Sequence, residues 1–302
     1  MLNQERSSIP SKMNHIAVDI IIPTYNRRDL LLEALKSVQD QTFSNWRCWI
    51  AEDGETKETL DTIKPFLEDG RFKYLPGKHA GFPAIPRNRA IRKGNAKYVS
   101  FLDDDDLWLP EKLEKQIEFL SSHAKCVLLG CNAFCWSGAE KKKKSPLYFK
   151  NSKLEKIDYK AMLQKNCLVH SSAILKRNAL EQAGLYNESL KPPIGEDYEL
   201  WLRMGVLGEI WVLHEPYVIF RETPMTYYKK LDRRQNYQAA ANIYEAALSG
   251  DGNKPSPLSY PKNAHLAAEC RRKRDFYLAG PRFLGRFRHK LTQKIKNIFN
   301  TF

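Results

Sequence analysis

The stretch VSFLDDDDLWLP, residues 99–110, places four consecutive aspartates directly after a short apolar run. The apolar run has the composition of a buried β-strand, so the aspartates stand where that strand ends. Four carboxylates at one place repel one another, and this repulsion costs stability unless a cation lies among them. Three explanations fit these residues: a metal ion, helix-capping interactions, or a solvated acidic turn.

Strand and helix signals alternate along the chain on both sides of this stretch. Short apolar runs predict strands over 18–26, 46–54, 71–77, 96–103 and 124–134. Amphipathic spacing and terminal signals predict helices over 27–41, 56–67, 85–94 and 109–123. This order is typical of an α/β fold with a mostly parallel sheet and flanking helices. Ligands of such sheets bind beyond the carboxyl ends of the strands, where this chain has polar loops at 23–27, 52–56 and 103–108.

The second half of the chain gives less regular signals. A basic, turn-rich segment covers 137–153, and 169–184 reads as a strand leading into a helix that ends at Gly184. A turn and a short helix are predicted over 192–208, followed by one or two strands over 209–222.

Composition points to a globular protein of 302 residues with a formal net charge of +14. No apolar run approaches the roughly 18 residues that span a bilayer, and the polar start lacks the apolar centre of a secretory signal. The six cysteines form no CxxC pair, which favours reduced thiols. These features together predict a cytoplasmic protein.

The positive charge is concentrated at the carboxyl end of the chain. Residues 271–302 hold ten lysines and arginines against the single acid Asp275, which is +9 of the +14. Apolar residues recur there at helical spacing, at Leu284, Phe287, Leu291, Ile295, Ile298 and Phe302. A basic amphipathic helix of this kind is typical of binding to an anionic membrane surface. The alternative is that this helix packs on the rest of the chain or on a partner subunit, and no recognisable nucleic-acid-binding module is present.

The aspartates suit a hard divalent cation. Mg²⁺ and Mn²⁺ are held in proteins by one or two carboxylates together with substrate phosphates. Asp103 with Asp105, or Asp104 with Asp105, could supply these ligands. The alternative is that Asp106 caps the helix beginning near Pro110 and the other carboxylates are solvated, and the residues alone leave both open.

Four segments resemble, in order and spacing, the family 2 glycosyltransferases, a group of GT-A-fold enzymes of which many build bacterial polysaccharides. They are VDIIIPTYNR (18–27), AEDGETKET (51–59), IPRNRAIRKGNAKYVSFLDDDDLWLPEKLEKQ (85–116) and GEDYELWLRM (195–204). The resemblance covers two thirds of the chain, from Val18 to Arg221. The chain departs from the usual motifs at Glu52, Glu55 and Ala90, and it has FRET where an arginine-x-histidine is often seen.

This resemblance implies an inverting, Mn²⁺- or Mg²⁺-dependent glycosyltransferase. Its donor would be a nucleotide-diphosphate sugar, UDP-linked, and its acceptor a saccharide that is lipid-linked, at the inner face of the cell membrane. One alternative is a sugar nucleotidyltransferase, which would need a glycine-rich loop after the first strand, where this chain has none. The other is a non-catalytic membrane or nucleic-acid adaptor on the same fold, which would be expected to lose the metal carboxylates or the base.

The resemblance also implies roles for donor-site residues. The nucleotide would be bound by eight residues, Pro23, Thr24, Tyr25, Asn26, Asp53, Arg87, Asp103 and Asp104. Tyr25 would stack on the base and Asp53 would accept a hydrogen bond from it. Arg87 would reach the base or the diphosphate, whereas Arg89 is expected to point outward. Asp105 would ligate the metal directly, with Asp103 binding the ribose or a metal-bound water.

The acceptor side would come from the segment GEDYELW. A single displacement needs a carboxylate that takes the proton of the acceptor hydroxyl. That general base is assigned to Asp197, with Glu196 as the second choice, and the alternative is that both acids only favour the start of a helix. Trp201 would form a sugar-stacking wall, with core packing as the alternative. His170 and His214 are expected to be structural.

The expected organisation therefore has four parts. They are a polar lead-in (1–16), a nucleotide-sugar-binding half (17–136), an acceptor-binding and catalytic-base half (137–225), and a helical extension with the basic tail (226–302).

Overall fold

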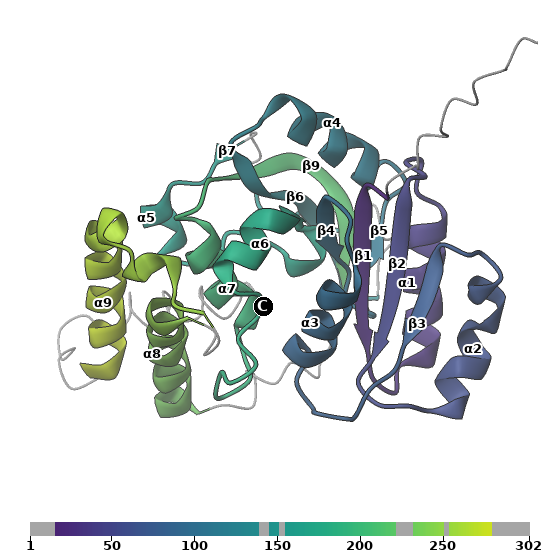
Figure 1. The fold of residues 1–302 in the computed structure, drawn as a ribbon, viewed down its shortest axis with the longest axis horizontal. Helices are drawn as coiled ribbons and strands as arrows, with labels where there is room; N and C mark the ends of the chain where they lie inside the picture. Colours follow the sequence, from purple (N-terminus) through teal and green to yellow (C-terminus); the bar gives the residue numbers. More distant parts are fainter. Residues whose placement is uncertain (1–15, 139–144, 151–154, 222–231, 251–253, 280–302) are drawn as a thin grey trace, which may run out of the picture.

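The computed structural model describes residues 16–138, 145–150, 155–221, 232–250 and 254–279, which form a sheet covered by helices (Figure 1). The strands are β1 (Val18–Thr24), β2 (Trp46–Glu52), β3 (Phe72–Leu75), β4 (Tyr98–Phe101), β5 (Leu107–Trp108), β6 (Cys126–Trp136), β7 (Glu155–Lys156), β8 (Ile174–Lys176) and β9 (Glu209–Arg221). The α-helices are α1 (Arg28–Gln39), α2 (Lys57–Leu67), α3 (Ala84–Lys93), α4 (Lys112–Ser122), α5 (Tyr159–Met162), α6 (Arg177–Ala183), α7 (Glu196–Met204), α8 (Arg233–Ser249) and α9 (Ala264–Ala279). Short 3-10 turns are η2 (His170–Ser172), η4 (Pro257–Ser259) and η5 (Pro261–Asn263).

Eight of the nine strands in the described part lie in the order β3-β2-β1-β4-β8-β6-β9-β5, and the ninth, β7, pairs with β9 outside this path. Most paired residues belong to parallel pairs, which join β1 to β2 and β4, β2 to β3, and β6 to β9. The predicted α/β fold with a mostly parallel sheet is therefore confirmed.

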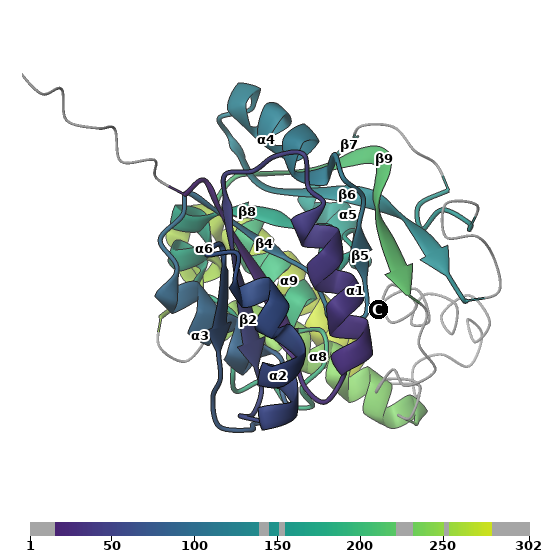
Figure 2. The ribbon, with the colours of Figure 1, turned by 90° about the vertical axis from the view of Figure 1, so that its right-hand side faces the viewer.

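Strand β1 explains why helices cover both faces of the sheet. It is buried along its whole length, and successive side chains of a strand point to opposite faces. Ile21 packs in the cluster that contains residues of α3, α6 and α7, whereas Ile20 and Ile22 pack in the cluster that contains residues of α1, α2 and α4. Figure 2 shows α3 and α6 on one side of the strands and α1 on the other.

Strand β8 inserts antiparallel between β4 and β6. Because β8 runs opposite to β4, the η2 turn before β8 lies against the residues that follow β4. The predicted strand-to-helix segment at 169–184 is confirmed, and Gly184 ends α6 in the left-handed conformation (φ 95°) that favours glycine.

Strand β5 was not predicted from the sequence. Its two residues pair antiparallel with the end of β9, Leu107 with Ile219 and Trp108 with Val218. The four aspartates therefore form a loop between two strands of the same sheet, which limits how far the loop can move.

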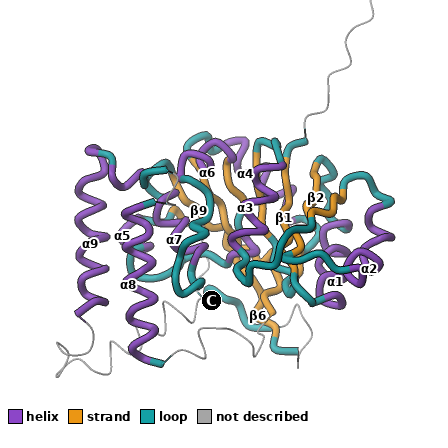
Figure 3. The backbone as a smooth tube through the Cα atoms, turned by 60° about the horizontal axis from the view of Figure 1, so that its bottom comes forward, coloured by secondary structure: helices purple, strands orange, loops and turns teal. Residues whose placement is uncertain are grey.

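Helices α8 and α9 lie side by side at one end of the molecule (Figure 3). The rings of Tyr244 and Tyr277 stack between them at a centroid distance of 5.7 Å. The predicted amphipathic tail lies outside the described residues. Within the described part, no helix combines the length and apolarity that a membrane span requires. All six cysteines are free thiols.

Candidate active site

The aspartate loop is a tight turn in which Asp106 N–H donates to the carbonyl of Asp103 (3.1 Å). Asp106 itself is buried, and its carboxylate accepts from Ser171 Oγ (2.5 Å) and from the backbone N–H of Arg221 (2.8 Å). Burial and the neighbouring charges of Asp105 and Asp103 raise its pKa well above the ordinary value. Asp106 therefore fastens the loop to η2 and to β9. The alternative in which it caps α4 is wrong, because no side chain caps that helix.

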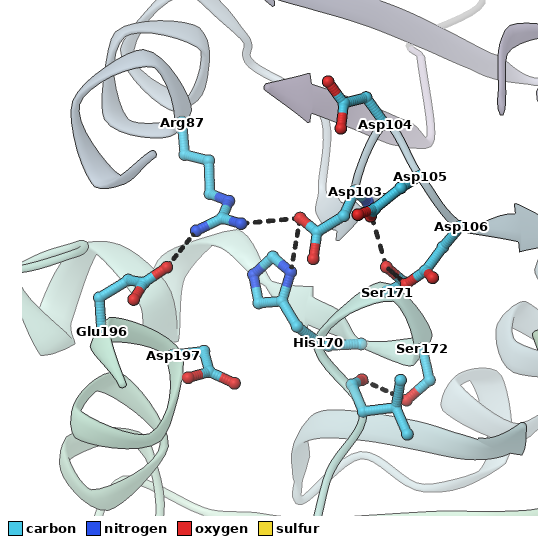
Figure 4. Close-up of polar contacts among 12 residues, drawn as sticks. Arg87, Asp103, Asp104, Asp105, Asp106, His170, Ser171, Ser172, Glu196 and Asp197 are labelled. Atoms are coloured by element: carbon cyan, nitrogen blue, oxygen red, sulfur yellow. Dashed lines mark hydrogen bonds and ion pairs between the residues drawn. The ribbon is translucent and has the colours of Figure 1, made fainter. Parts of the chain in front are cut away.

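Asp103 lies between the side chains of Arg87 and His170. Its Oδ1 accepts from Arg87 Nη2 (2.7 Å) and lies 3.3 Å from His170 Nδ1, and its backbone N–H donates to Ser171 Oγ (3.1 Å) (Figure 4). Burial alone would raise the pKa of Asp103, but His170 and Arg87 outweigh it and hold that pKa well below the ordinary range. Asp103 is consequently ionised under all ordinary conditions.

Arg87 joins the two halves of the site. It projects from α3, is buried, and its Nη1 donates to Glu196 Oε1 (2.7 Å) on α7 while Nη2 binds Asp103. Burial opposes the guanidinium charge, yet the carboxylates of Asp103 and Glu196 raise the pKa of Arg87 above its ordinary value. A buried arginine with two carboxylate partners stays charged and fixes both of them.

Asp197 is the second residue of α7 and follows Glu196 directly (Figure 4). It is buried, and Asn166 Nδ2 donates to its Oδ2 (3.0 Å). Burial and the negative charge of Glu196 raise the pKa of Asp197 to about 6. Such a pKa leaves the carboxylate ionised at neutral pH and basic enough to accept a proton.

Asp104 and Asp105 contact the last residue of β1 and the loop that follows it. Thr24 Oγ1 donates to Asp104 Oδ2 (2.8 Å), and Arg27 Nη1 lies 3.0 Å from both Asp104 Oδ1 and Asp105 Oδ2. Burial raises the pKa of Asp104 to about 6 despite the opposing charge of Arg27. No signal in the sequence marks Arg27 as a partner of these aspartates.

The other end of the site lies at the carboxyl ends of β1 and β2. Tyr25 is exposed, and its ring stacks on His79 with centroids 4.1 Å apart. The Asp53 carboxylate is buried and accepts from the backbone N–H groups of Ala80 and Gly81 (2.8 Å each). Asp53 thus orders the loop that carries His79, beside Tyr25.

The remaining residues of the predicted nucleotide loop adjoin this end. Pro23 is buried in β1 opposite Ala51 of β2, and Asn26 turns the chain out of β1 with a positive φ of 53°. The whole predicted loop, from Pro23 to Asn26, therefore lies between the aspartate loop and Asp53.

The expected sugar-stacking role of Trp201 and the expected outward direction of Arg89 are wrong, and the alternative of core packing for Trp201 is confirmed. Trp201 is fully buried in the core, so its indole ring has no open face for an acceptor sugar. Arg89 points inward, where its Nη2 donates to the carbonyls of Glu52 and Leu75 (3.2 Å for Leu75). Trp201 packs in the core, and Arg89 joins the ends of β2 and β3, so both side chains stabilise the fold around the site.

His170 was expected to be structural and lies in the centre of the site (Figure 4). Besides approaching Asp103, its Nε2 lies 2.8 Å from the hydroxyl of Tyr186, and its ring stacks over Phe101 at 5.2 Å. A lone histidine carries no signal of this kind. Only the antiparallel pairing of β8 with β4 brings the residue before β8 to the aspartates after β4.

The donor set of the loop fits a hard divalent ion. Asp105 and Asp103 offer carboxylate oxygens, and the Asp105 side chain retains 17% of its exposure. Among the residues that the structure describes, no group of three or more His, Cys, Asp or Glu side chains is arranged around a common metal position. The arrangement therefore suits an ion that is held by one or two carboxylates and otherwise by substrate phosphates and water, as is usual for Mg²⁺.

The family described as Glycosyl transferase family 2 matches residues 19–184, more than half of the chain. The β-1,3-glucosyltransferase WfgD of Escherichia coli is 30% identical over 190 residues, covering 63% of this chain and 70% of its own. Its name gives UDP-Glc as donor and a diphosphoundecaprenol-linked sugar as acceptor. An uncharacterized glycosyltransferase of Rickettsia bellii is 30% identical over 196 residues, but the match spans only 26% of that protein's length.

Solved structures show the same fold. TarS residues 1–349 of S. aureus, in complex with UDP, superposes with a TM-score of 0.65 at 18% identity, covering 94% of this chain and 80% of the other. The mannosyltransferase PcManGT of Pyrobaculum calidifontis, in complex with GDP-Man and Mn²⁺, gives a TM-score of 0.55 at 16% identity, covering 94% of this chain and 80% of the other. Because the family match covers more than half of the chain and includes the aspartate loop, the chain belongs to glycosyl transferase family 2, a family of glycosyltransferases.

Proposed function

We propose that this chain transfers a sugar from a UDP-linked donor to a saccharide acceptor with inversion at the anomeric carbon. The observation that carries the proposal is the position of Asp197. It lies on α7, across the Arg87 bridge from Asp103, with its pKa raised to about 6. This arrangement sets a basic carboxylate opposite a donor-side carboxylate in one site.

In the proposed reaction the acceptor hydroxyl attacks the anomeric carbon from the side opposite the leaving diphosphate. A new carbon–oxygen bond forms, the bond to the diphosphate oxygen breaks with its electron pair, and Asp197 takes the hydroxyl proton. Glu196 is less suited to this role because its Oε1 accepts from Arg87. Asn166 orients the Asp197 carboxylate by donating to Oδ2.

On the donor side, Tyr25 would stack on the base and Asp53 would accept from it, while Asp103 would bind the ribose. Asp105, with Asp103, would hold Mn²⁺ or Mg²⁺, whose charge would neutralise the departing diphosphate. His170 and Arg87 keep Asp103 ionised and fixed for either task.

We further propose that the acceptor is lipid-linked and belongs to bacterial surface polysaccharide synthesis. WfgD supports this, because its name gives a diphosphoundecaprenol-linked sugar as the acceptor. The enzyme would then work as a peripheral protein on the inner face of the membrane. The basic sequence from Arg282 onward is suited to hold it there.

The test is an assay of the purified protein with UDP-Glc, UDP-GlcNAc and GDP-Man in the presence of Mn²⁺. Slow release of UDP from a UDP-sugar, abolished by chelation of the metal, is the expected result. Hydrolysis of none of the donors, or release of pyrophosphate from UTP and a sugar 1-phosphate, would contradict the proposal. The latter would indicate nucleotidyl transfer.

A further inference from the structure

Arg27 places one positively charged nitrogen between two aspartates. Its Nη1 lies 3.0 Å from Asp104 Oδ1 and 3.0 Å from Asp105 Oδ2. The side chain is half-exposed, whereas the side chains of Asp104 and Asp105 retain only 6% and 17% of their exposure. The guanidinium therefore reaches from the surface into the acidic loop and neutralises part of it.

The ion pair of Arg27 competes with any other cation at Asp105. A divalent ion that ligates Asp105 adds positive charge within a few ångströms of the guanidinium. Two cations at that separation repel each other, so the closer approach of one weakens the binding of the other.

The side chain of Arg27 has space into which it can move away from the aspartates. It is the residue immediately before α1, directly after the loop predicted to hold the nucleotide. An open hollow of about 500 Å³ adjoins it, lined among others by Asn26, Arg28 and Thr62. A long, half-exposed side chain at that position can leave the aspartates without any backbone change.

We infer that Arg27 is the counter-ion of Asp105 until a divalent ion displaces it, and that the displaced guanidinium then pairs with the diphosphate of the donor. The inference rests on the proposed function, since it assumes that Asp105 ligates the metal. It makes Arg27 a donor-site residue that couples metal binding to nucleotide binding. An arginine suits this role because its guanidinium pairs equally well with carboxylates and phosphates.

The test is calorimetric titration of Mn²⁺ into the full chain, first alone and then with saturating UDP. Arg27→Met keeps the length of the side chain and removes the charge. The matched control is Arg28→Met, which removes the same charge from the exposed neighbouring position. A third protein, Arg27→Met with Asp105→Asn, shows whether any change in affinity runs through Asp105.

Without nucleotide, Arg27→Met is expected to bind Mn²⁺ about three- to tenfold more tightly than the parent, the effect of removing one competing charge pair. With UDP the order should reverse, because the variant lacks the contact to the diphosphate. Arg28→Met should follow the parent in both titrations, and Asp105→Asn should remove the gain. A merely structural ion pair would give neither the tighter Mn²⁺ binding without UDP nor the weaker Mn²⁺ binding with UDP.

Two results would overturn the inference in distinguishable ways. Equal Mn²⁺ affinity in parent and Arg27→Met would reject the counter-ion role and leave the metal site standing. Absence of Mn²⁺ binding in both proteins, with and without UDP, would reject the inference together with the metal assignment on which it rests.

Discussion

Asp197 is buried and has a raised pKa, and this combination predicts a pH profile. Because its pKa is about 6, turnover should fall as the pH is lowered through about 6 and the base becomes protonated. Asp197→Asn should lower kcat by about 10² or more while UDP binding stays at the parental level. Steady-state rates from pH 5 to 8 and calorimetry with UDP measure both. Near-parental turnover in the variant would move the base to Glu196 or elsewhere.

The same pKa has the opposite consequence for stability. The folded protein holds a proton on Asp197 up to about pH 6, whereas an unfolded aspartate loses it near 3.8. Stability contributed by the protonated form is therefore lost as pH rises from about 4 to 6, and the ionised group costs up to about 3 kcal/mol above that range. At pH 8, Asp197→Asn should therefore melt at a higher temperature than the parent. This difference in melting temperature should be larger at pH 8 than at pH 4. Glu196→Gln should show no such gain, because it weakens the ion pair of the buried Arg87.

Substitution by alanine should have different effects at two neighbouring aspartates of the loop. Asp105→Ala should abolish metal-dependent UDP binding with little change in melting temperature, because the side chain is partly exposed and its partner Arg27 reaches solvent. Asp106→Ala should lower the free energy of unfolding by about 1–3 kcal/mol, because it leaves Ser171 Oγ and the Arg221 N–H without their acceptor. Melting curves and UDP titrations with and without Mn²⁺ separate the two. Unchanged Mn²⁺-dependent binding in Asp105→Ala would contradict the metal assignment.

At the scale of elements, the η2 turn supports the aspartate loop through one hydroxyl group. Ser171 Oγ accepts from Asp103 N–H and donates to Asp106, whereas the hydroxyl of its neighbour Ser172 donates to the carbonyl of Val169 within the turn (2.7 Å). Ser171→Ala should therefore lower kcat several-fold more than Ser172→Ala, although both side chains are buried and both variants lose a hydrogen bond. Comparable losses of turnover at comparable melting temperatures would contradict the supporting role of Ser171.

Elements with strong local signals could be predicted from the sequence. The apolar face of α1, with Leu31, Leu35 and Val38, is buried as its spacing indicates. Strand β5 could not be predicted, because two residues carry no periodicity and their pairing partner lies more than a hundred residues away in β9. The contacts of Arg27 and His170 could not be predicted for a similar reason, because they depend on which strand ends meet in the fold. Trp201 was misplaced because helical spacing does not tell which neighbours cover a face.

At the scale of the whole molecule, the charge of the tail predicts a membrane interaction. Truncation after Gly280 removes the basic residues from Arg282 onward together with the apolar stripe. The shortened protein should lose binding to anionic vesicles but keep its melting temperature and donor hydrolysis. Binding of the intact protein should weaken as salt rises, because the Debye length is about 10 Å at 0.1 M. Vesicle sedimentation and melting curves of both proteins measure this.

The rival explanation for the tail makes the reverse prediction. If the stripe packs on the catalytic domain, truncation should lower the melting temperature, and neither protein should sediment with vesicles. That pair of results would reject the membrane role.

The double pairing of Arg87 has a consequence for how such enzymes can diversify. Its partners, Asp103 and Glu196, come from the halves of the chain that are predicted to bind the donor and the acceptor, so neither half carries a complete set of charges by itself. A hybrid that joins this donor half to a relative's acceptor half would bury an arginine lacking its second carboxylate, unless the incoming segment supplied an acid at the position of Glu196. Exchange of acceptor specificity by recombination is therefore limited to partners that share this one acid, whatever the rest of their sequence.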